Sequence, residues 1–298
     1  NSAQNSGATL GYYSPIHASV RSGWTYGIPV RWTVTYSGTD YVRFLGRVWV
    51  IDPEPGQYQT RRVHVIAYDV IRDFVESPIR ELDIQVSQQE DDLINEILAA
   101  LPDESRPFGT SIAVGLDTYP YAFDDVGPGT RAAALLRDIV LSAYGMAYVK
   151  GDGTFVYKTR TQRTLVVSQL TLTESLITGL DVPSPLDRVY NRVRATIHPK
   201  TVDAAATTVL WGQTGTAPQI AAGATMTIWG AFRDPDVENR MIGGTATVTP
   251  AATTDYTGNA NADGLGADRT ADVSVTMTAF ASTAKFAVKN TGTTALYL

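Results

Sequence analysis

IPVRWTVTYSGTDYVRFLGRVWVID, residues 28–52, is the stretch that decides the fold of this chain. Apolar and polar residues alternate on both sides of a turn-forming cluster, Ser37–Asp40. Because successive side chains of a strand point to opposite faces, this alternation predicts a β-hairpin with one buried face. The residues expected on that face of the first strand are Val30, Trp32, Val34 and Tyr36. Gly46 interrupts the second strand, where glycine is typical of a bulge or a close backbone approach.

The next segment continues the β pattern across a loop. Residues Asp52–Thr60 contain two prolines and a glycine, which predicts an irregular arm between strands. The run RRVHVIAYDV (Arg61–Val70) predicts a further strand. Asp69 at its end is expected to cap a short helix, because its carboxylate can accept hydrogen bonds from free backbone N–H groups.

Two longer helices are predicted downstream. Ser87–Glu90 reads as a capping box, followed by Leu93, Ile94, Ile97, Leu98 and Leu101 at helical spacing and by the helix-ending Pro102. The second helix is expected over about Thr130–Tyr144, with Gly145 at the position after its C-cap. The cluster Gly151–Gly153 then predicts the turn of another hairpin.

The composition changes after about residue 200, where Ala, Thr and Gly dominate and charges become sparse. Four segments alternate with period two and are separated by turn residues, which predicts a small β-sandwich. These segments are Ala224–Phe232, Gly244–Pro250, Ala271–Phe280 and Ala284–Asn290.

The fold class expected from these patterns is α+β and mostly β, with two inserted helices followed by the β-sandwich. The expected division is a β-rich domain over 1–85, a helix-containing α+β insert over 86–165, return strands over 166–204 and the β-sandwich over 205–298. The chain begins at Asn1 rather than Met and ends in an apolar run. We therefore expect further sequence before residue 1 and after Leu298.

Composition excludes several classes of function. The net charge of −6 and the isoelectric point of about 5.1 argue against a broad nucleic-acid surface or adhesion to an anionic membrane, both of which need clustered Lys and Arg. There is no cysteine, so neither a disulfide framework, a thiolate metal site nor a cysteine nucleophile can form. No run of 18 apolar residues is present, so no membrane-spanning segment is expected.

Catalytic motifs are also missing from the sequence. His17, His64 and His198 are far apart, none has a metal-ligand neighbour at i+2 or i+4, and no G-x-S-x-G motif is present. YPYAFDD (Tyr119–Asp125) is the best candidate sugar site, because aromatic residues precede two carboxylates. The alternative is a loop that packs its own tyrosines.

NANADG (Asn259–Gly264) resembles the start of a calcium loop, but position 12 is Thr270 instead of Glu. A plain turn is the alternative interpretation. The sequence therefore predicts no catalytic residue, no cofactor and no bound metal. The functional candidates are exposed aromatic residues that could anchor a partner, namely Trp49, Tyr58, Tyr119, Tyr121 and Phe123, of which the last three are expected in a loop.

The order of motifs resembles that of the tail hub, or baseplate-hub-like, proteins of tailed phages and phage-derived particles. The matching motifs are Tyr13–Pro15 for its F-S-P segment, Gly27–Val30 for G-x-P-V and Phe44–Val48 for F-x-G-R-V. The helix, D-G hairpin and arginine over 130–160 and the strand around Asn191 are similar to later parts of that family. Residues 229–235 and 285–298 resemble its appended sandwich, so the resemblance covers nearly the whole chain.

The resemblance implies a structural protein of the virion, made in the host cytoplasm, that forms a homotrimeric ring. Its implied partners are the distal tail and tail tube proteins above, the tape-measure protein, and tail fibre or tip proteins below. The implied mechanism is assembly and gating rather than catalysis, without a cofactor. Two alternatives remain at this point: a carbohydrate-binding or adhesin-like module for host attachment, and a hydrolase that cleaves cell walls.

Overall fold

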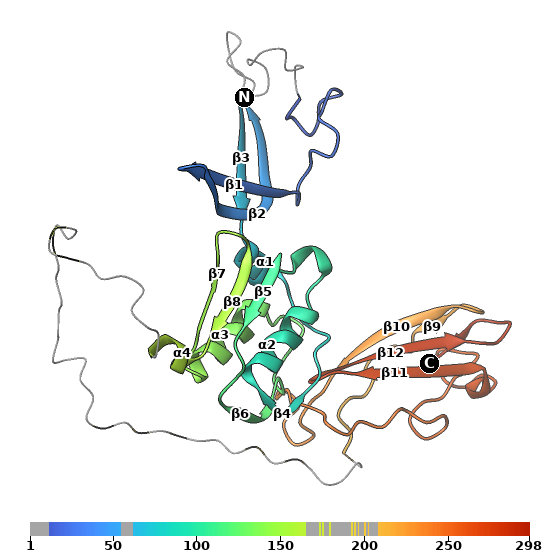
Figure 1. Ribbon diagram of the computed structural model, residues 1–298. Helices are drawn as coiled ribbons and strands as arrows, with labels where there is room; N and C mark the ends of the chain where they lie inside the picture. The colour runs from blue at the N-terminus through green and yellow to red at the C-terminus, as the bar shows by residue number, and fades with distance from the viewer. Residues whose placement is uncertain are drawn as a thin grey trace.

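A computed structural model describes residues 12–54, 62–164 and 208–298, together with a few isolated residues between 165 and 207. Figure 1 shows three parts: an N-terminal sheet, a middle unit that contains the helices, and a C-terminal unit of strands. The fold is α+β with mostly β structure, as predicted. The predicted return strands over 166–204 lie almost entirely outside the described residues.

The N-terminal sheet is antiparallel, in the order β1-β2-β3. Its strands are β1 (Pro29–Tyr36), β2 (Thr39–Glu54) and β3 (Arg62–Tyr68). Ser37 and Gly38 join β1 to β2 with φ values of 49° and 79°, the left-handed values that a two-residue hairpin turn requires. The predicted hairpin is thus confirmed. The predicted burial of its apolar face is wrong, because no other described element covers the β1 end of that face.

Gly46 of β2 allows two backbones to approach closely, as its position in the strand predicted. A methyl group added at Gly46 would lie 2.2 Å from the carbonyl oxygen of Tyr68 and 2.5 Å from the ring of Phe44. β2 is also irregular between Val48 and Val50, where its register with β3 shifts by one residue. This bulge places Trp49 outside the regular alternation of the sheet.

The middle unit packs its helices against two small sheets (Figure 1). One sheet pairs β4 (Gln85–Gln89) with β6 (Thr118–Ala122), and the other has the order β5-β8-β7 over Gly109–Ile112, Thr154–Lys158 and Met146–Val149. The helices are α1 (Val70–Glu76), α2 (Glu90–Ala99), α3 (Ala132–Ser142) and the short α4 (Arg160–Thr164), with a 3-10 turn over Asp103–Ser105.

One apolar core holds the middle unit together. It contains the leucines and isoleucines predicted on the inner faces of α2 and α3, and also Val70, Phe74, Ile79 and Leu82. The expected domain boundary at residue 85 therefore falls within a shared core. Asp69 caps α1 as predicted, because its carboxylate accepts a hydrogen bond from the Ile71 N–H at 3.1 Å.

The capping box predicted at Ser87–Glu90 does not form. Ser87 belongs to strand β4, and α2 begins at Glu90 after a Gln89 N-cap without a side-chain hydrogen bond. Pairing of β4 with β6 continues through Gln89, so the strand runs directly into the helix. The Glu90 side chain instead points into the protein, where its carboxylate accepts hydrogen bonds from the Leu116 and Asp117 N–H groups.

The end of α3 also differs from the prediction. Tyr144, and not Gly145, adopts the left-handed conformation, with φ of 52°. The Tyr144 and Gly145 N–H groups donate to the carbonyls of Leu141 and Val140, which is a Schellman arrangement. Gly145 is required for a different reason: a methyl group there would lie 2.6 Å from the ring of Tyr157.

The C-terminal unit contains a three-stranded sheet in the order β10-β12-β11 and a two-stranded ladder of β9 with β13. These strands are Gln219–Ile220 (β9), Thr225–Ala231 (β10), Val273–Ala279 (β11), Thr283–Asn290 (β12) and Leu296–Tyr297 (β13), with a 3-10 turn, η4, over Thr270–Asp272. The strand predicted over Gly244–Pro250 is wrong, because this segment forms no ladder. It folds over the apolar face of the sheet as irregular chain.

Contacts near the start of β12 attach the C-terminal unit to the middle unit. The Ala281 N–H donates to the Leu82 carbonyl at 2.8 Å, and the Ser282 hydroxyl donates to the Val126 carbonyl. The Arg80 guanidinium lies 4.8 Å from the centre of the Trp229 ring, a cation–π contact. Across the described ranges, no helix is both long enough and apolar enough to cross a membrane.

Arg47 joins the N-terminal sheet to the middle unit. Its guanidinium forms an ion pair with Asp73 of α1 at 2.9 Å, donates to the Arg106 carbonyl at 2.8 Å and lies over the Phe108 ring at 4.6 Å. Burial raises the pKa of Asp73, although the charge of Arg47 acts in the opposite direction. The pair is mostly shielded from solvent, with side-chain exposures of 17% and 16%.

We predict that Arg47→Met loosens this attachment. The substitution leaves the Asp73 carboxylate partly buried without its partner, which costs about 2 kcal/mol. Amides of β1–β3 should then exchange with deuterium faster while those of α2 keep their rates, because the loss is local. Arg43→Met is the matched control in the same strand, since Arg43 is exposed. Equal exchange in the Arg47→Met variant and the unmodified chain would contradict the prediction.

Candidate interaction surface

One face of the N-terminal sheet is apolar and exposed. In the observed register, β1 residues at alternate positions share this face with Tyr41 of β2 and Val65 of β3. Trp32 is 62% exposed, Tyr36 73% and Tyr41 43%. Val34 and Val65 are exposed as well. Trp32, Val34, Tyr36 and Tyr41 differ from scattered surface residues, because they are neighbours on the β1–β2 hairpin, whereas Val65 pairs with Ile51 toward the other end of β2.

The same face carries no charged residue at a register position. Going along the strands, its remaining members are Val30, Thr39, Phe44, Gly46, Val48, Ile51, Pro53, Val63 and Ala67. Arg43 lies in the bulge, and its guanidinium is 5.6 Å from the centre of the Tyr41 ring. The charged side chains Arg31, Asp40 and Arg47 lie on the opposite face. We call this surface the uncharged sheet face.

A second aromatic cluster includes the predicted anchor Trp49. This side chain is 44% exposed and meets the Tyr68 ring edge-on at 6.4 Å. The Arg72 guanidinium of α1 lies over both rings, at 5.1 and 5.4 Å from their centres, and pairs with Glu76 at 2.9 Å. Trp49 is thus accessible, but its own chain already holds it in place.

The other predicted anchors have different environments. Tyr119 and Tyr121 belong to strand β6, so their expected location in a loop is wrong. Tyr121 is partly buried and lines a cavity, whereas Phe123 is buried in the core of the middle unit. Phe123 therefore packs within its own chain. Tyr58 lies outside the described residues.

A buried carboxylate organises the polar centre of the middle unit. Glu90 is 1% exposed, and its carboxylate accepts hydrogen bonds from the Leu116 N–H at 2.7 Å and the Asp117 N–H at 3.2 Å. Asp91 accepts a third bond from the Gly115 N–H at 2.9 Å. The start of α2 therefore fixes the loop that precedes β6.

This polar centre extends to the end of α3. Asp117 forms an ion pair with Arg160, whose hydrogen bond lowers the pKa of the Asp117 carboxyl against the effect of burial. The hydroxyls of Tyr119 and Ser142 lie 2.6 Å apart, and burial raises the pKa of Tyr119. The hydrogen bonds and ion pairs of these groups hold loops and helix ends together. Among the described residues, none of these bonds joins a nucleophile to a histidine.

Tyr157 is the unusual member of this centre. Its ring is almost fully buried and its hydroxyl has no hydrogen-bond partner among the described residues. Burial raises the pKa of Tyr157 to about 12, and the negative charge of Glu90 adds to this effect. An unpaired buried hydroxyl costs free energy that a phenylalanine at the same position would avoid.

We predict that Tyr157→Phe stabilises the protein by about 1 kcal/mol at pH 7. In the unmodified chain, the folded-state pKa lies above the ordinary value of 10.0, so ionisation favours the unfolded state. The contribution of Tyr157 to stability is therefore fully present below pH 10 and is lost as the pH rises toward 12. Urea unfolding at pH 7 and 11 measures both effects, and Tyr148→Phe is the control. A destabilised Tyr157→Phe variant would show that the hydroxyl has a partner.

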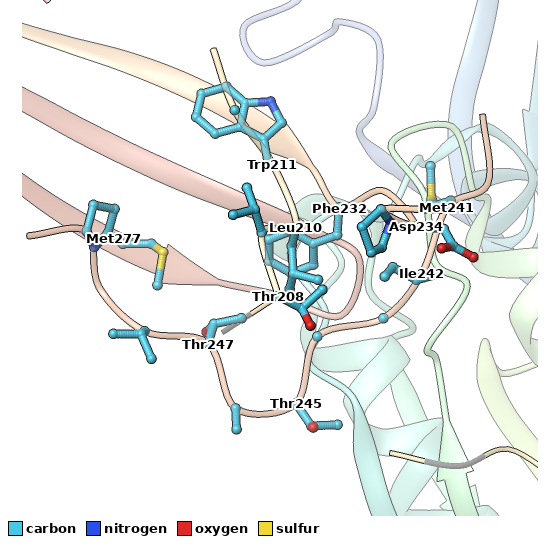
Figure 2. A pocket seen from close by; sticks show the side chains of 18 of the residues that line it. Thr208, Leu210, Trp211, Phe232, Asp234, Met241, Ile242, Thr245, Thr247 and Met277 are labelled. Carbon is cyan, nitrogen blue, oxygen red and sulfur yellow. The ribbon is translucent and has the colours of Figure 1, made fainter. Parts of the chain in front are cut away.

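An open cavity of about 1580 Å³ is lined mainly by the C-terminal unit and, at one side, by Ile84, Tyr121, Asp124 and Asp125 of the middle unit. Its floor is the apolar face of the β10-β12-β11 sheet, which includes Ile228, Met277 and Phe286. Figure 2 shows the loop with Thr245 and Thr247 curving around the segment that carries Thr208 and Leu210. Trp211 stacks on Phe286 at 5.0 Å.

The rim of this cavity carries the carboxylates predicted as a sugar site. Asp124 and Asp125 follow β6 of the middle unit, and Asp234 of the C-terminal unit lines the same cavity. Asp124 forms an ion pair with Lys200, and Asp234 pairs with Arg240 at 3.5 Å. The structure thus brings acids and the aromatic rings of Tyr121 and Trp211 to one cavity. No local sequence signal could have joined these distant segments.

The turn considered as a calcium loop is held by its own backbone. The Asn259 side-chain oxygen accepts hydrogen bonds from the Asn261 and Gly266 N–H groups, and its amide donates to the Gly264 and Gly266 carbonyls. These bonds occupy the oxygen at the first position of the loop template, as expected for a plain turn. Within the described ranges, no group of three or more His, Asp or Glu residues is arranged to hold a metal ion.

The histidines are not brought together in the described chain. His17 accepts a hydrogen bond from the Ser19 N–H at 3.1 Å, and His64 lies opposite Asp52 in the sheet. His198 is outside the described residues. Comparison with known proteins finds no matching family model and no matching curated protein.

Proposed function

We propose that this chain is a structural protein of a phage virion, a tail hub component that assembles into a homotrimeric ring. The observation that supports this proposal is the uncharged sheet face, because a large exposed apolar surface on a folded chain is typical of an assembly interface. The order of motifs that resembles tail hub proteins supports it independently. The role is to join the tail tube and distal tail ring to the tail tip or fibres, not to catalyse a reaction.

The anatomy of the chain suits such a role. The N-terminal sheet and the C-terminal unit lie at different sides of the middle unit (Figure 1), so each can contact a different neighbour. The middle unit provides the rigid core between them. The tape-measure protein and the tail fibre or tip proteins are further proposed partners, and the net charge of −6 would limit adhesion of passing DNA.

The test is the location of the chain in purified tail particles. Mass spectrometry should detect it there, and cryo-electron microscopy should find three copies at the distal end of each tail tube. Purified chain should also bind tail tubes that carry the distal ring. Absence of the chain from intact tails, with no binding to tubes, would contradict the proposal. Cell-wall zymograms with the purified chain should give no clearing.

A second candidate function is carbohydrate binding for host attachment. The cavity lined by the C-terminal and middle units favours it, because Tyr121, Trp211 and five Asp side chains line one recess, and sugars bind to such combinations of rings and carboxylates. Binding on a glycan array that is lost in Asp125→Ala would support this alternative. Asp263→Ala, on an exposed turn away from the cavity, is the control. If the unmodified chain bound no glycan on the array, the carbohydrate-binding function would be contradicted.

A further inference from the structure

We infer that the uncharged sheet face packs against a second copy of this chain. The N-terminal sheet has an apolar face, and such a sheet is stable when another layer covers that face. Here Val48 and Ile51 at one end of the face are buried, while Trp32, Tyr36 and Tyr41 at the other end are exposed.

The exposed apolar area of the face is in the range of surfaces that bind a partner. From the exposed fractions of the three aromatic side chains and Val34, which are neighbours on the β1–β2 hairpin, it is on the order of 500 Å². This is close to the largest apolar patch of a typical monomer, which is about 300–600 Å² and often functional. It is also more than half of the roughly 800 Å² that each partner contributes to a standard protein interface.

The chemistry of the face selects the class of occupant. Nucleic acid and anionic membranes bind rows of Lys and Arg, and the face has none at its register positions. A strongly charged protein would lose the hydration of its charges here without gaining ion pairs. Interfaces between permanently associated identical subunits, in contrast, are rich in aromatic and apolar side chains.

Large and small side chains alternate on the exposed end of the face. The large rings of Trp32, Tyr36 and Tyr41 alternate with the smaller Val34 and Thr39 across β1 and β2. A second copy can place its rings against these smaller residues, which gives the close packing of a protein interior. In addition, the Tyr36 and Tyr41 hydroxyls can keep hydrogen bonds at the edge of such an interface.

This inference rests in part on the proposed function, because it names the surface through which the ring would form. A face-to-face arrangement about a twofold axis gives a dimer, and three faces that converge on a threefold axis give a trimer. Both bury the same residues. The mass of the assembly distinguishes them without affecting the assignment of the surface.

The first experiment is sedimentation of the full chain with matched variants. Unmodified chain should sediment as a multiple of 32.2 kDa at micromolar concentration. The double variant Trp32→Thr and Tyr36→Thr should weaken self-association at least 100-fold and sediment as a monomer. Trp49→Thr is the control, because Trp49 is a similarly exposed aromatic residue outside this face. An unmodified chain that stays monomeric, or a Trp49→Thr variant that dissociates equally, would overturn the inference.

A second experiment does not depend on disrupting the interface. Because the chain has no native cysteine, Val34→Cys and Thr35→Cys each introduce one thiol on opposite faces of β1. Maleimide should label Thr35→Cys quickly and Val34→Cys at least ten times more slowly, until dilution separates the copies. Equal labelling of the two thiols at all concentrations would overturn the inference.

Two outcomes separate this inference from the proposed function. Self-association through the face by a chain that is absent from tail particles would keep the inference and remove the hub role. A monomeric chain that still binds tail tubes would keep the hub role and overturn the inference of self-association. Flotation with neutral phosphatidylcholine vesicles that depends on Trp32 and Tyr36, without self-association, would overturn the inference and assign the face to a membrane surface.

Discussion

Glu90→Ala is expected to lower the free energy of unfolding by about 3 kcal/mol. The substitution removes a buried carboxylate and leaves the Leu116 and Asp117 N–H groups without their acceptor. A buried donor that loses its partner costs more than the hydrogen bond itself contributed, because it also loses hydration. The loop before β6 should therefore loosen, and the ion pair of Asp117 with Arg160 should lose its fixed geometry.

Urea unfolding followed by circular dichroism measures this effect as a lower midpoint with an unchanged slope. Glu90→Gln keeps one acceptor oxygen but brings an amide NH₂ group toward two donors, so it should cost about 2 kcal/mol. Asp92→Ala is the control, because Asp92 is an exposed carboxylate in the same helical turn, and it should change stability by less than about 0.5 kcal/mol. A Glu90→Ala variant as stable as this control would show that the loop needs no anchor.

Gly46→Ala should cost about 3 kcal/mol and act on the N-terminal sheet. The added methyl group would overlap the Tyr68 carbonyl oxygen at 2.2 Å and the Phe44 ring at 2.5 Å. A ring can rotate, but the carbonyl belongs to the backbone of β3, so β2 and β3 must separate locally. Hydrogen exchange should accelerate in β2 and β3 before it changes in α2 or α3.

Gly129→Ala is the matched control for this effect. Gly129 has no heavy atom within 4 Å of an added methyl group, and its φ is not in the left-handed region. Alanine there should be neutral or stabilising by up to about 1 kcal/mol, because it restricts the unfolded chain. If Gly46→Ala matched this control in both stability and exchange, the close approach of β2 and β3 would not exist in solution.

The local elements of the fold were predictable because their signals are short in sequence. The Ser37–Asp40 turn, the Asp69 cap and the Gly151–Gly153 turn each follow from the conformational preferences of a few residues. The apolar spacing of α2 and α3 correctly predicted which residues enter the core. The close approach at Gly46 was predicted in kind, although the sequence could not identify Tyr68 as the neighbour.

The errors occurred where distant segments compete for the same residue. Ser87 and Glu90 match a capping box, but β4 pairs with β6 on both sides of Ser87, and the Leu116 and Asp117 N–H groups bind the Glu90 carboxylate. Gly145 matches a helix end, but the ring of Tyr157 is the reason for its small size. In both cases a tertiary contact replaced the local one, because it satisfies buried polar groups or fills space more completely.

The sequence by itself determined the fold class, the hairpins, the helices and the absence of cysteine chemistry, because periodicity and turn residues act over a few positions. Only the tertiary structure decided which apolar faces are covered. Alternation along β1 is the same whether a second layer lies on it or not, and Trp32 and Tyr36 proved to be exposed while Phe123 proved to be buried. The candidate interaction surface therefore depends on what packs on the sheet, which is a property of segments far apart in the chain.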